Sequence, residues 1–152
     1  MVVNHTIGII DNAQICLNEH VINSMARTYP SSDYKYCDEC GAEIITACQK
    51  CNTPILGAHH TPDRGIICDY SPPQFCHDCG EPFPWTKSKL ETAKELANRL
   101  EGLSERDRDM LKESIENLIK DSPRTKLAEV QFKLIMKKVG SDSYEIMKKI
   151  PS

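Results

Sequence analysis

The sequence predicts a small α+β protein made of two unlike halves that meet near residue 85. Every cysteine and every histidine lies before Trp85. Residues 1–85 contain four basic and ten acidic residues, a net charge of −6. Residues 86–152 contain fifteen basic and twelve acidic residues, a net charge of +3. Apolar residues with the helical period of 3.6 lie almost entirely in the second half. We therefore divide the 152 residues into two domains, 1–85 and 86–152.

The cysteines of the first half occur in closely spaced pairs. Structural zinc takes four Cys or His ligands from two such pairs, because a two-residue spacer lets both sulfurs of one turn face one ion. A disulfide framework does not require that spacing. A redox role would need one pair to open a helix after a strand, and none is placed so. The pairs therefore predict two bound Zn²⁺ ions, and in chain order they are Cys16/His20, Cys37/Cys40, Cys48/Cys51 and Cys76/Cys79.

An internal repeat favours a sequential grouping of these pairs. The segment from Tyr36 to Gly41 (YCDECG) resembles the segment from Phe75 to Gly80 (FCHDCG). The glycine after the second cysteine suits the positive φ of a zinc-ribbon turn. If both segments close a ribbon, site one holds Cys16, His20, Cys37 and Cys40, and site two holds Cys48, Cys51, Cys76 and Cys79. We therefore expect tandem zinc ribbons with short β-hairpins, including strands at 21–23 and 43–46 and a turn at 29–33.

Two other groupings stay open at this point. A nested grouping joins 37/40 to 48/51 across a seven-residue hairpin and leaves 16/20 to meet 76/79. A cross-brace, as in RING-type domains, joins 16/20 to 48/51 and 37/40 to 76/79. The sequential grouping leaves sixteen and twenty-four residues between paired turns, which is ample for a β-hairpin in each case.

Several residues that could bind metal fall outside the four pairs. A third site from His59, His60 and Cys68 would have an open position for water and could support hydrolysis. Cys68 has no short-spaced partner, so we favour solvent-facing loop histidines and a spare thiol. His5 and Cys68 are the substitutes if Cys16 or His20 is not a ligand. We expect no enzyme, since no other catalytic motif stands out.

Helical patterns organise the second half into a predicted bundle of three to four helices. A first helix carries apolar residues from Leu90 to Leu100 and ends at Gly102. A capping box, Ser104 to Asp107, opens a second helix. Ser122 and Pro123 start a third helix, and a fourth covers 144–149. The predicted inner faces are Leu111, Ile115, Leu118 and Ile119 in the second helix, and Leu127, Val130, Leu134, Ile135 and Val139 in the third.

The charge and size of the helical half suggest how it could interact. Residues 124–149 contain seven basic and three acidic residues. A solvated helix face is the favoured interpretation, and a phosphate-binding face is the alternative. The core available to about 65 residues is modest, which makes homo-oligomerisation through this half an expectation to test.

The first residues of the chain and its many cysteine thiols indicate the cellular compartment that we expect. The first residues lack a charged leader and a cleavage site, and no stretch approaches 18 apolar residues. We therefore expect a cytoplasmic protein without a membrane segment, where thiols stay reduced and available for metal.

The order of four motifs and the helices after them is similar to a known family. The motifs are QICLNEHVINSMARTYP, YCDECGA, CQKCNTPI and FCHDCGEPFPW, followed by SPRTKLAEVQFKLIMKKVG. This order resembles a bacterial family of small zinc-ribbon proteins catalogued as a domain of unknown function. The resemblance covers most of the chain and implies two zinc ribbons and a bacterial cytoplasmic setting, without an activity.

Three functions compete on this evidence. The favoured hypothesis is a non-catalytic adaptor whose two zinc ions form a rigid platform for a protein partner. Nucleic-acid binding would have to use the basic helices, because the acidic ribbon half repels phosphate. A RING-like transfer or regulatory factor would require the cross-brace.

Overall fold

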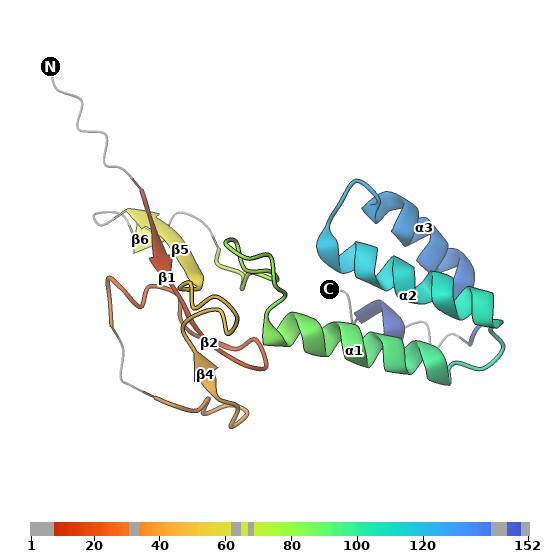
Figure 1. Ribbon diagram of the computed structural model, residues 1–152, viewed down its shortest axis with the longest axis horizontal. Helices are drawn as coiled ribbons and strands as arrows, with labels where there is room; N and C mark the ends of the chain where they lie inside the picture. Colours follow the sequence, from red (N-terminus) through yellow and green to blue (C-terminus); the bar gives the residue numbers. More distant parts are fainter. Residues whose placement is uncertain (1–7, 31–33, 62–64, 67–68, 141–145, 150–152) are drawn as a thin grey trace, which may run out of the picture. The chain divides into compact units, whose positions relative to one another are not determined.

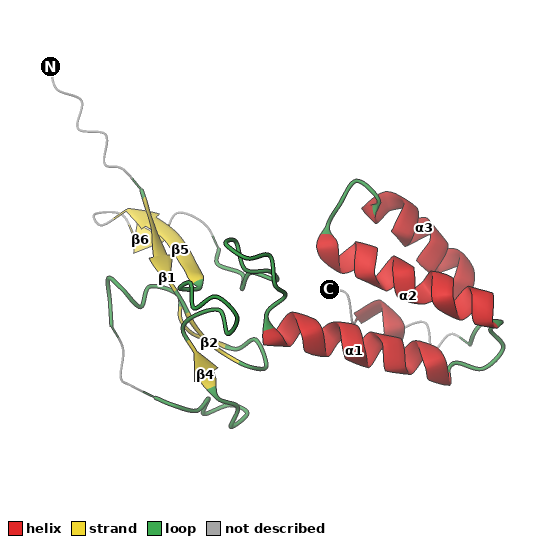
Figure 2. Cartoon of the chain, viewed as in Figure 1, coloured by secondary structure: helices red, strands yellow, loops and turns green. Residues whose placement is uncertain are grey.

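The computed structural model describes residues 8–30, 34–61, 65–66, 69–140 and 146–149. The chain separates into two compact units, Met1–Trp85 and Thr86–Ser152, which we describe one at a time. Short antiparallel strands occupy the first unit and helices occupy the second, as the colouring in Figure 2 shows. The prediction of a small α+β protein with short β-hairpins is confirmed. None of the helices in the described part of the chain is long and apolar enough to cross a bilayer.

Two small antiparallel sheets share one continuous segment of chain in the first unit (Figure 1). One sheet has the order β1-β5-β6 and the other has the order β3-β2-β4. Only Ala13 separates β1 from β2, so this segment passes directly from the first sheet into the second. The strands predicted at 21–23 and 43–46 are present as β3 and β4. The strands are β1 (Ile9–Asn12), β2 (Gln14–Cys16), β3 (Val21–Asn23), β4 (Ile44–Ile45), β5 (Leu56–Thr61) and β6 (Gly65–Ile66).

The core of the first unit combines aliphatic, aromatic and cysteine side chains. Trp85 is 2% exposed and stacks on Phe83 with ring centroids 4.8 Å apart. Its indole Nε1 donates to the carbonyl of Pro73 at 2.9 Å, so its polar atom is satisfied on burial. The buried cluster is completed by Ala13, Ile15, Ile45, Cys48, Ile55 and Cys76.

A buried carboxylate anchors the loop after β3 to the first sheet. Asp11 accepts hydrogen bonds from the backbone N–H groups of Asn12 (2.7 Å), Arg27 (2.8 Å) and Thr28 (3.2 Å). His60 Nε2 lies 2.9 Å from the same carboxylate, and both side chains are almost fully buried. Burial alone would raise the pKa of Asp11, but these hydrogen bonds hold it well below its ordinary range. Asp11 therefore joins segments distant in sequence as an ionised acceptor.

The same loop passes very close to β5, and this approach requires Gly57. The Ala58 N–H donates to the Ser24 carbonyl at 2.7 Å, and the Ala26 N–H donates to the Asn12 carbonyl at 2.9 Å. A Cβ at position 57 would lie 2.7 Å from the carbonyl carbon of Asn12 and would also collide with the Ser24 carbonyl. Both obstacles are backbone atoms, which cannot turn aside as a side chain could.

Three helices and a short helical segment make up the second unit. The helices are α1 (Pro84–Arg99), α2 (Glu105–Lys120) and α3 (Thr125–Met136), and residues 146–149 are also helical. The capping box is confirmed, because the Ser104 hydroxyl accepts from the Asp107 N–H at 3.1 Å. The first helix begins at Pro84, earlier than its apolar stripe indicated, with proline in the first helical position. Residues 144 and 145 of the predicted fourth helix lie outside the described residues.

The predicted start and inner face of the third helix are partly wrong. Ser122 and Pro123 lie in a turn, and α3 begins at Thr125, whose hydroxyl accepts from the Ser122 N–H at 2.8 Å. The second helix packs against α3. The face of α3 that is buried comprises Ala128, Phe132, Ile135 and Met136.

The opposite face of α3 carries three of the five residues that were expected inside, whereas Ile135 is buried as predicted. Leu127, Val130 and Leu134 are 57%, 54% and 56% exposed. Apolar residues occur on both faces of this helix. Periodicity therefore predicts that the segment is helical but not which of its two faces packs against α2. Phe132 and Met136 lie in the buried stripe, which therefore buries the larger side chains.

Substitution of Gly57 by alanine should destabilise the first unit. The added methyl group meets backbone on two sides, so we expect a loss of about 2–3 kcal/mol in the free energy of unfolding. Chemical denaturation of the zinc-saturated protein measures this change. Gly140→Ala is the matched control, because a Cβ there has open space around it. Equal stability of the two variants would contradict the close approach.

Candidate metal centres

Each of the three Cys-x-x-Cys segments folds into the same turn. The N–H of the first cysteine donates to the carbonyl five residues later at 2.8–2.9 Å, and the residue after the second cysteine donates back to the carbonyl of the first at 2.8–2.9 Å. An isolated β-bridge closes each turn, as between Tyr36 and Glu43. The residue after the second cysteine has a positive φ of 72°, 61° and 74° at Gly41, Asn52 and Gly80. These turns hold both sulfurs on one side of the backbone.

Asn52 is the member of this set that the glycine repeat did not identify. Asparagine is the residue that replaces glycine most readily in the left-handed region, since its short polar side chain interacts with nearby backbone. The sequence contained this signal, because an asparagine directly follows Cys51 as a glycine follows Cys40 and Cys79.

The fourth ligand pair comes from the hairpin that joins β2 to β3. The Cys16 N–H donates to the His20 carbonyl at 3.0 Å, and the Glu19 N–H donates to the Cys16 carbonyl at 2.9 Å. Glu19 has a φ of 73°, an uncommon value for a residue with a Cβ. This turn brings the backbone N–H of His20 to 3.3 Å from the Cys16 sulfur.

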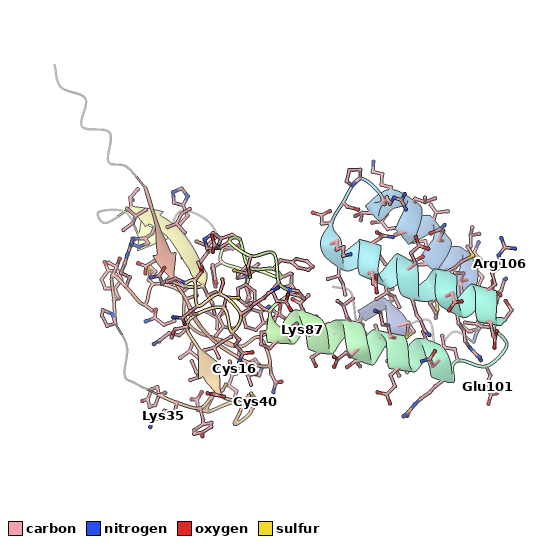
Figure 3. The ribbon with its side chains drawn as sticks, viewed as in Figure 1. Cys16, Lys35, Cys40, Lys87, Glu101 and Arg106 are labelled. Atoms are coloured by element: carbon pink, nitrogen blue, oxygen red, sulfur yellow. The ribbon has the colours of Figure 1, made fainter. Side chains whose placement is uncertain are left out.

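The first cluster joins this hairpin to the turn at Cys37. Cys16, His20, Cys37 and Cys40 each offer one ligand atom, and these four atoms lie within 4.8 Å of one another. The sulfurs of Cys16 and Cys40 are 3.7 Å apart, and His20 Nδ1 is 3.5 Å from the Cys37 sulfur. Figure 3 labels Cys16 and Cys40, whose side chains approach from separate segments of the first unit.

The second cluster joins the turn at Cys48 to the turn at Cys76. Its four cysteines also have their ligand atoms within 4.8 Å of one another. The sulfur distances are 3.7 Å for Cys48 to Cys79 and 3.6 Å for Cys51 to Cys76. Across both clusters the structure brings the four pairs together in sequential order, and among the described residues it shows neither the nested nor the cross-braced grouping.

These spacings suit tetrahedral zinc. With Zn–S bonds of about 2.3 Å and Zn–N bonds of about 2.0–2.1 Å, a tetrahedron separates two sulfurs by about 3.8 Å and a sulfur from a nitrogen by about 3.5 Å. The observed 3.6–3.7 Å and 3.5 Å agree with both values. A disulfide would need about 2.05 Å. The seven cysteines in the clusters are free thiols, so each cluster can supply four ligands to one ion.

Polar neighbours orient the ligands of the first cluster. Asn18 Nδ2 donates to the Cys40 sulfur at 3.4 Å. His20 directs Nδ1 at the cluster, and its Nε2 lies 3.8 Å from the Glu39 carboxylate. A carboxylate near the outer ring nitrogen is the usual partner of a metal-bound histidine, because it favours the tautomer that leaves Nδ1 unprotonated.

In the second cluster, polar contacts connect the two turns. Lys50 Nζ lies 3.2 Å from the Glu81 carboxylate, and the Thr53 hydroxyl donates to Asp78 at 3.1 Å. The same hydroxyl lies 3.2 Å from the Cys51 sulfur. The turns at Cys48 and Cys76 are thus held together by side chains as well as by their sulfurs.

Two thiols near the surface of the clusters are acidified by their surroundings. The backbone amide of Ala42 is the largest influence on Cys40 and, together with Asn18, lowers the pKa of its thiol to about 6. Hydrogen-bonding contacts with the side chain and the backbone of Thr53 lower the pKa of the Cys51 thiol to about 6. These two sulfurs are therefore largely thiolate, the form that binds metal, at neutral pH.

Other thiols in the clusters resist ionisation. The backbone amide of Glu81 lowers the pKa of Cys79, but burial and the neighbouring thiols together outweigh it and raise that pKa to about 12. Burial also raises the pKa of the Cys16 thiol. Several sulfurs this close cannot all become anionic unless a cation offsets their repulsion, so metal binding releases protons from these thiols.

The hypothetical third site does not assemble from the residues that the structure describes. His59 and His60 are adjacent in β5, so their side chains point to opposite faces; His59 is exposed and His60 is buried against Asp11. The expectation of solvent-facing loop histidines is therefore wrong in placing both residues in a loop, and its solvent exposure is confirmed for His59 but wrong for His60. His5 and Cys68 lie outside the described residues.

Asp11, His60 and Thr28 also fail as a nucleophilic triad. The Asp11 carboxylate and the Thr28 hydroxyl both approach the same ring nitrogen, Nε2, at 2.9 Å and 3.4 Å. A triad needs the carboxylate on one ring nitrogen and the nucleophile on the other. The contacts of Asp11 and His60 instead join the loop after β3 to the first sheet.

Comparison with known proteins identifies a family but no activity. A family model described as "Uncharacterized protein conserved in bacteria (DUF2321)" matches residues 9–151. No curated protein and no solved structure matches the chain.

Paired cysteine substitutions test the grouping directly. We expect the purified wild type to carry two zinc ions per chain. Because Cys48 and Cys76 belong to one cluster, Cys48→Ser with Cys76→Ser should retain one zinc, measured by elemental analysis of the purified protein. Cys37→Ser with Cys48→Ser removes one ligand from each cluster and should lose both.

The pair of double variants separates the three groupings. In a cross-brace, loss of Cys48 and Cys76 would empty both sites. In a nested arrangement, loss of Cys37 and Cys48 would spare one. Either result would contradict the clusters described above.

Removal of the Thr53 hydroxyl should weaken zinc retention at the second cluster. Thr53→Val raises the pKa of Cys51, so protons compete better for its sulfur and zinc leaves at a higher pH. We expect about tenfold weaker zinc binding. Competition with a chelator, measured from neutral to acidic pH, gives this change in affinity. Thr46→Val, at an exposed threonine of the same unit, is the control. Identical release curves for the two variants would refute a role for this hydroxyl.

Proposed function

We propose that this chain, which belongs to the bacterial DUF2321 family, is a non-catalytic zinc-binding adaptor with two structural Zn²⁺ ions. The observation that carries the proposal is the completeness of both clusters, each with four ligand atoms at tetrahedral spacing. A structural zinc site is closed by four protein ligands, whereas a catalytic site keeps one position for water or substrate. An ion in either cluster would have no ligand position left for a reactant.

The finer architecture that we propose is a pair of tandem zinc ribbons followed by a helical bundle. The repeated turns at Cys37, Cys48 and Cys76 support the ribbons, since each is closed by the same β-bridge. The segment 41–47 leads from the first cluster to the second and contains β4, which pairs with β2. Ile45 and Ile55 lie in one apolar cluster with Cys48 and Cys76. Metal sites joined through one core would move as a rigid unit.

A partner could contact the groove beside the first cluster. The groove has a volume of about 350 Å³ and an aliphatic base from Val21, Ile22 and Ile44. Two tyrosines in its lining, Tyr34 and Tyr36, are 67% and 65% exposed. Tyrosine supplies a large contact area with little loss of conformational entropy, which is why it is enriched in protein interfaces.

Charge indicates which partners would suit the groove. Asp38 and Glu39 are exposed in its lining. Zinc bound by three thiolates and a histidine carries a net charge of −1, and zinc bound by four thiolates carries −2, so metal binding leaves the ribbons acidic. A protein segment with lysine or arginine beside an apolar residue would be complementary, since cations also bind tyrosine rings.

Nucleic-acid binding through the basic helices remains the second candidate. The observation in its favour is the exposure of Lys126, Lys133 and Lys137 at α3. These lysines alternate with exposed apolar side chains, which phosphate contacts do not need. A RING-like factor has less support, because it depends on the cross-braced grouping.

The proposal also concerns compartment and chemistry. Zinc thiolates persist where thiols stay reduced, so a cytoplasmic setting suits the adaptor. We assign no catalysis: the buried polar pair, Asp11 and His60, is accounted for by its contacts with the loop after β3.

Capture of partners from the source bacterium tests the adaptor. We expect zinc-loaded protein to retain a specific protein at physiological salt, and Tyr34→Ser with Tyr36→Ser to lose it because the groove loses its aromatic contacts. Mass spectrometry of the captured material measures the difference. Ile10→Ser is the matched control, because Ile10 is 53% exposed in the other sheet.

Two results would oppose the adaptor: capture of no specific protein, and a third tightly bound metal ion per chain, which would reopen catalysis. A captured set that the tyrosine substitutions do not change would oppose the groove as the contact surface.

A further inference from the structure

The outward face of α3 carries a narrow apolar seam with basic residues along its edges. Leu127, Val130 and Leu134 follow the spacing i, i+3, i+7, which is the a and d pattern of a helix that packs on another helix. Each is more than half exposed. The face that packs on α2 is the opposite one, so the seam has no cover among the described residues of the second unit.

Lysines occupy the positions beside this seam. Lys126 and Lys133 precede Leu127 and Leu134, which makes them g positions of the heptad, and both are exposed. Lys138 follows the end of α3 and lies 2.9 Å from Asp107 of α2. In paired helices the e and g side chains meet across the seam and decide which partner is accepted.

These charges argue against a second copy of the chain on this seam. In an antiparallel pair of α3 helices, Lys126 would meet Lys133 of the other copy at the g positions. In a parallel pair, Lys126 would meet Gln131, the e residue within α3. The antiparallel pair places like charges together, which is destabilising, and the parallel pair offers the lysine no carboxylate.

The shape of the seam argues against a membrane surface. A helix that lies in a bilayer interface needs a wide apolar face, commonly with tryptophan or phenylalanine. The seam has three aliphatic side chains on a narrow arc, and Phe132 points to the buried face. A second helix fits this shape better than a lipid layer does.

We propose that the seam on α3 docks an amphipathic α-helix of a different protein, with apolar residues at its a and d positions and aspartate or glutamate beside them. α3 has 12 residues, so a partner helix of three to four turns covers it. The acidic side chains of that helix pair with Lys126 and Lys133, while its apolar side chains cover Leu127, Val130 and Leu134. This inference rests on the proposed adaptor function for its premise of a protein partner and adds a second surface, separate from the ribbon groove.

A pair of synthetic peptides tests the seam without knowledge of the natural partner. Both peptides have three heptads with leucine at a and d; one has glutamate at every e and g position, and the other has lysine there. Like charges keep each peptide from pairing with itself. The zinc-loaded full chain carries Tyr34→Ser and Tyr36→Ser in this assay, so that the groove, which suits basic segments, does not capture the lysine peptide. Fluorescence anisotropy of labelled peptide should then show binding of the glutamate peptide, weakened by salt, and no binding of the lysine peptide.

Variants of the full chain locate the binding. Val130→Asp should weaken binding of the glutamate peptide by about tenfold or more, because it places a charge in the centre of the seam. Lys126→Glu with Lys133→Glu should reverse the preference, so that the chain binds the lysine peptide. This gain of binding shows that the double variant is folded. Lys120→Glu, an exposed lysine of α2, is the matched control and should leave the preference unchanged.

Several results would overturn the proposal. Equal binding of both peptides, or no effect of Val130→Asp, would show that the seam does not select the glutamate peptide. Wild-type dimers that Val130→Asp dissociates would indicate a second copy of the chain. Binding to phosphatidylglycerol vesicles that depends on Val130, with both peptides unbound, would indicate a membrane. If capture of the bacterial partner still depends on Tyr34 and Tyr36, each of these results leaves the adaptor proposal standing. If capture does not depend on the two tyrosines while the glutamate peptide still binds, the groove is refuted and the seam is kept.

Discussion

Each cluster holds four ligand atoms within 4.8 Å of one another, and the first unit depends on what keeps them there. Thiolates at such distances repel one another, and neutral thiols gain little from the contact. A zinc ion would turn the repulsion into four bonds and fix two turns at once. The apolar cluster around Trp85 has eight buried residues among those described, two of them cysteines of the second cluster, so a bound metal would add stability that burial alone does not provide.

The two clusters are connected by backbone and by buried polar contacts. The β1–β2 segment carries Asp11 in one sheet and Cys16 in the other. Asp11 holds the loop after β3, while Cys16 belongs to the first cluster. The strand β4 pairs with β2 and leads directly into the turn at Cys48. Strain or metal loss at one cluster would therefore be transmitted to the other through two short strands.

The sequence predicted the ligand sets because their signal is local. A two-residue spacer and a following glycine describe a turn completely, and the repeat of Tyr36–Gly41 at Phe75–Gly80 selected the order in which turns meet. The capping box at Ser104 was local in the same way. The repeat did not include the turn at Cys48, because asparagine holds its left-handed position at Asn52 where the other two turns have glycine.

Contacts between residues that lie far apart in the sequence could not be predicted from the sequence. His60 meets Asp11 across 49 positions, so nothing near either residue showed that His60 is buried. The rotation of α3 depends on which of its two apolar stripes meets α2, and both stripes have helical spacing. Where a helix has one apolar face, as in α2 with Leu111, Ile115 and Ile119, the prediction of its buried residues was mostly right.

A protein with closed metal sites, as we propose this one to be, would act through the surfaces that those sites hold in place. The groove beside the first cluster combines exposed tyrosines with acidic residues, and α3 combines an aliphatic seam with lysines. The two surfaces have opposite charge and different shape, so they would select different partners. X-ray absorption spectroscopy of the zinc-loaded chain tests most directly whether the sites are closed. We predict a shell of seven sulfurs and one imidazole nitrogen distributed over two ions, with Zn–S distances of about 2.3 Å. An oxygen ligand in that shell, or fewer sulfurs per ion, would contradict the account.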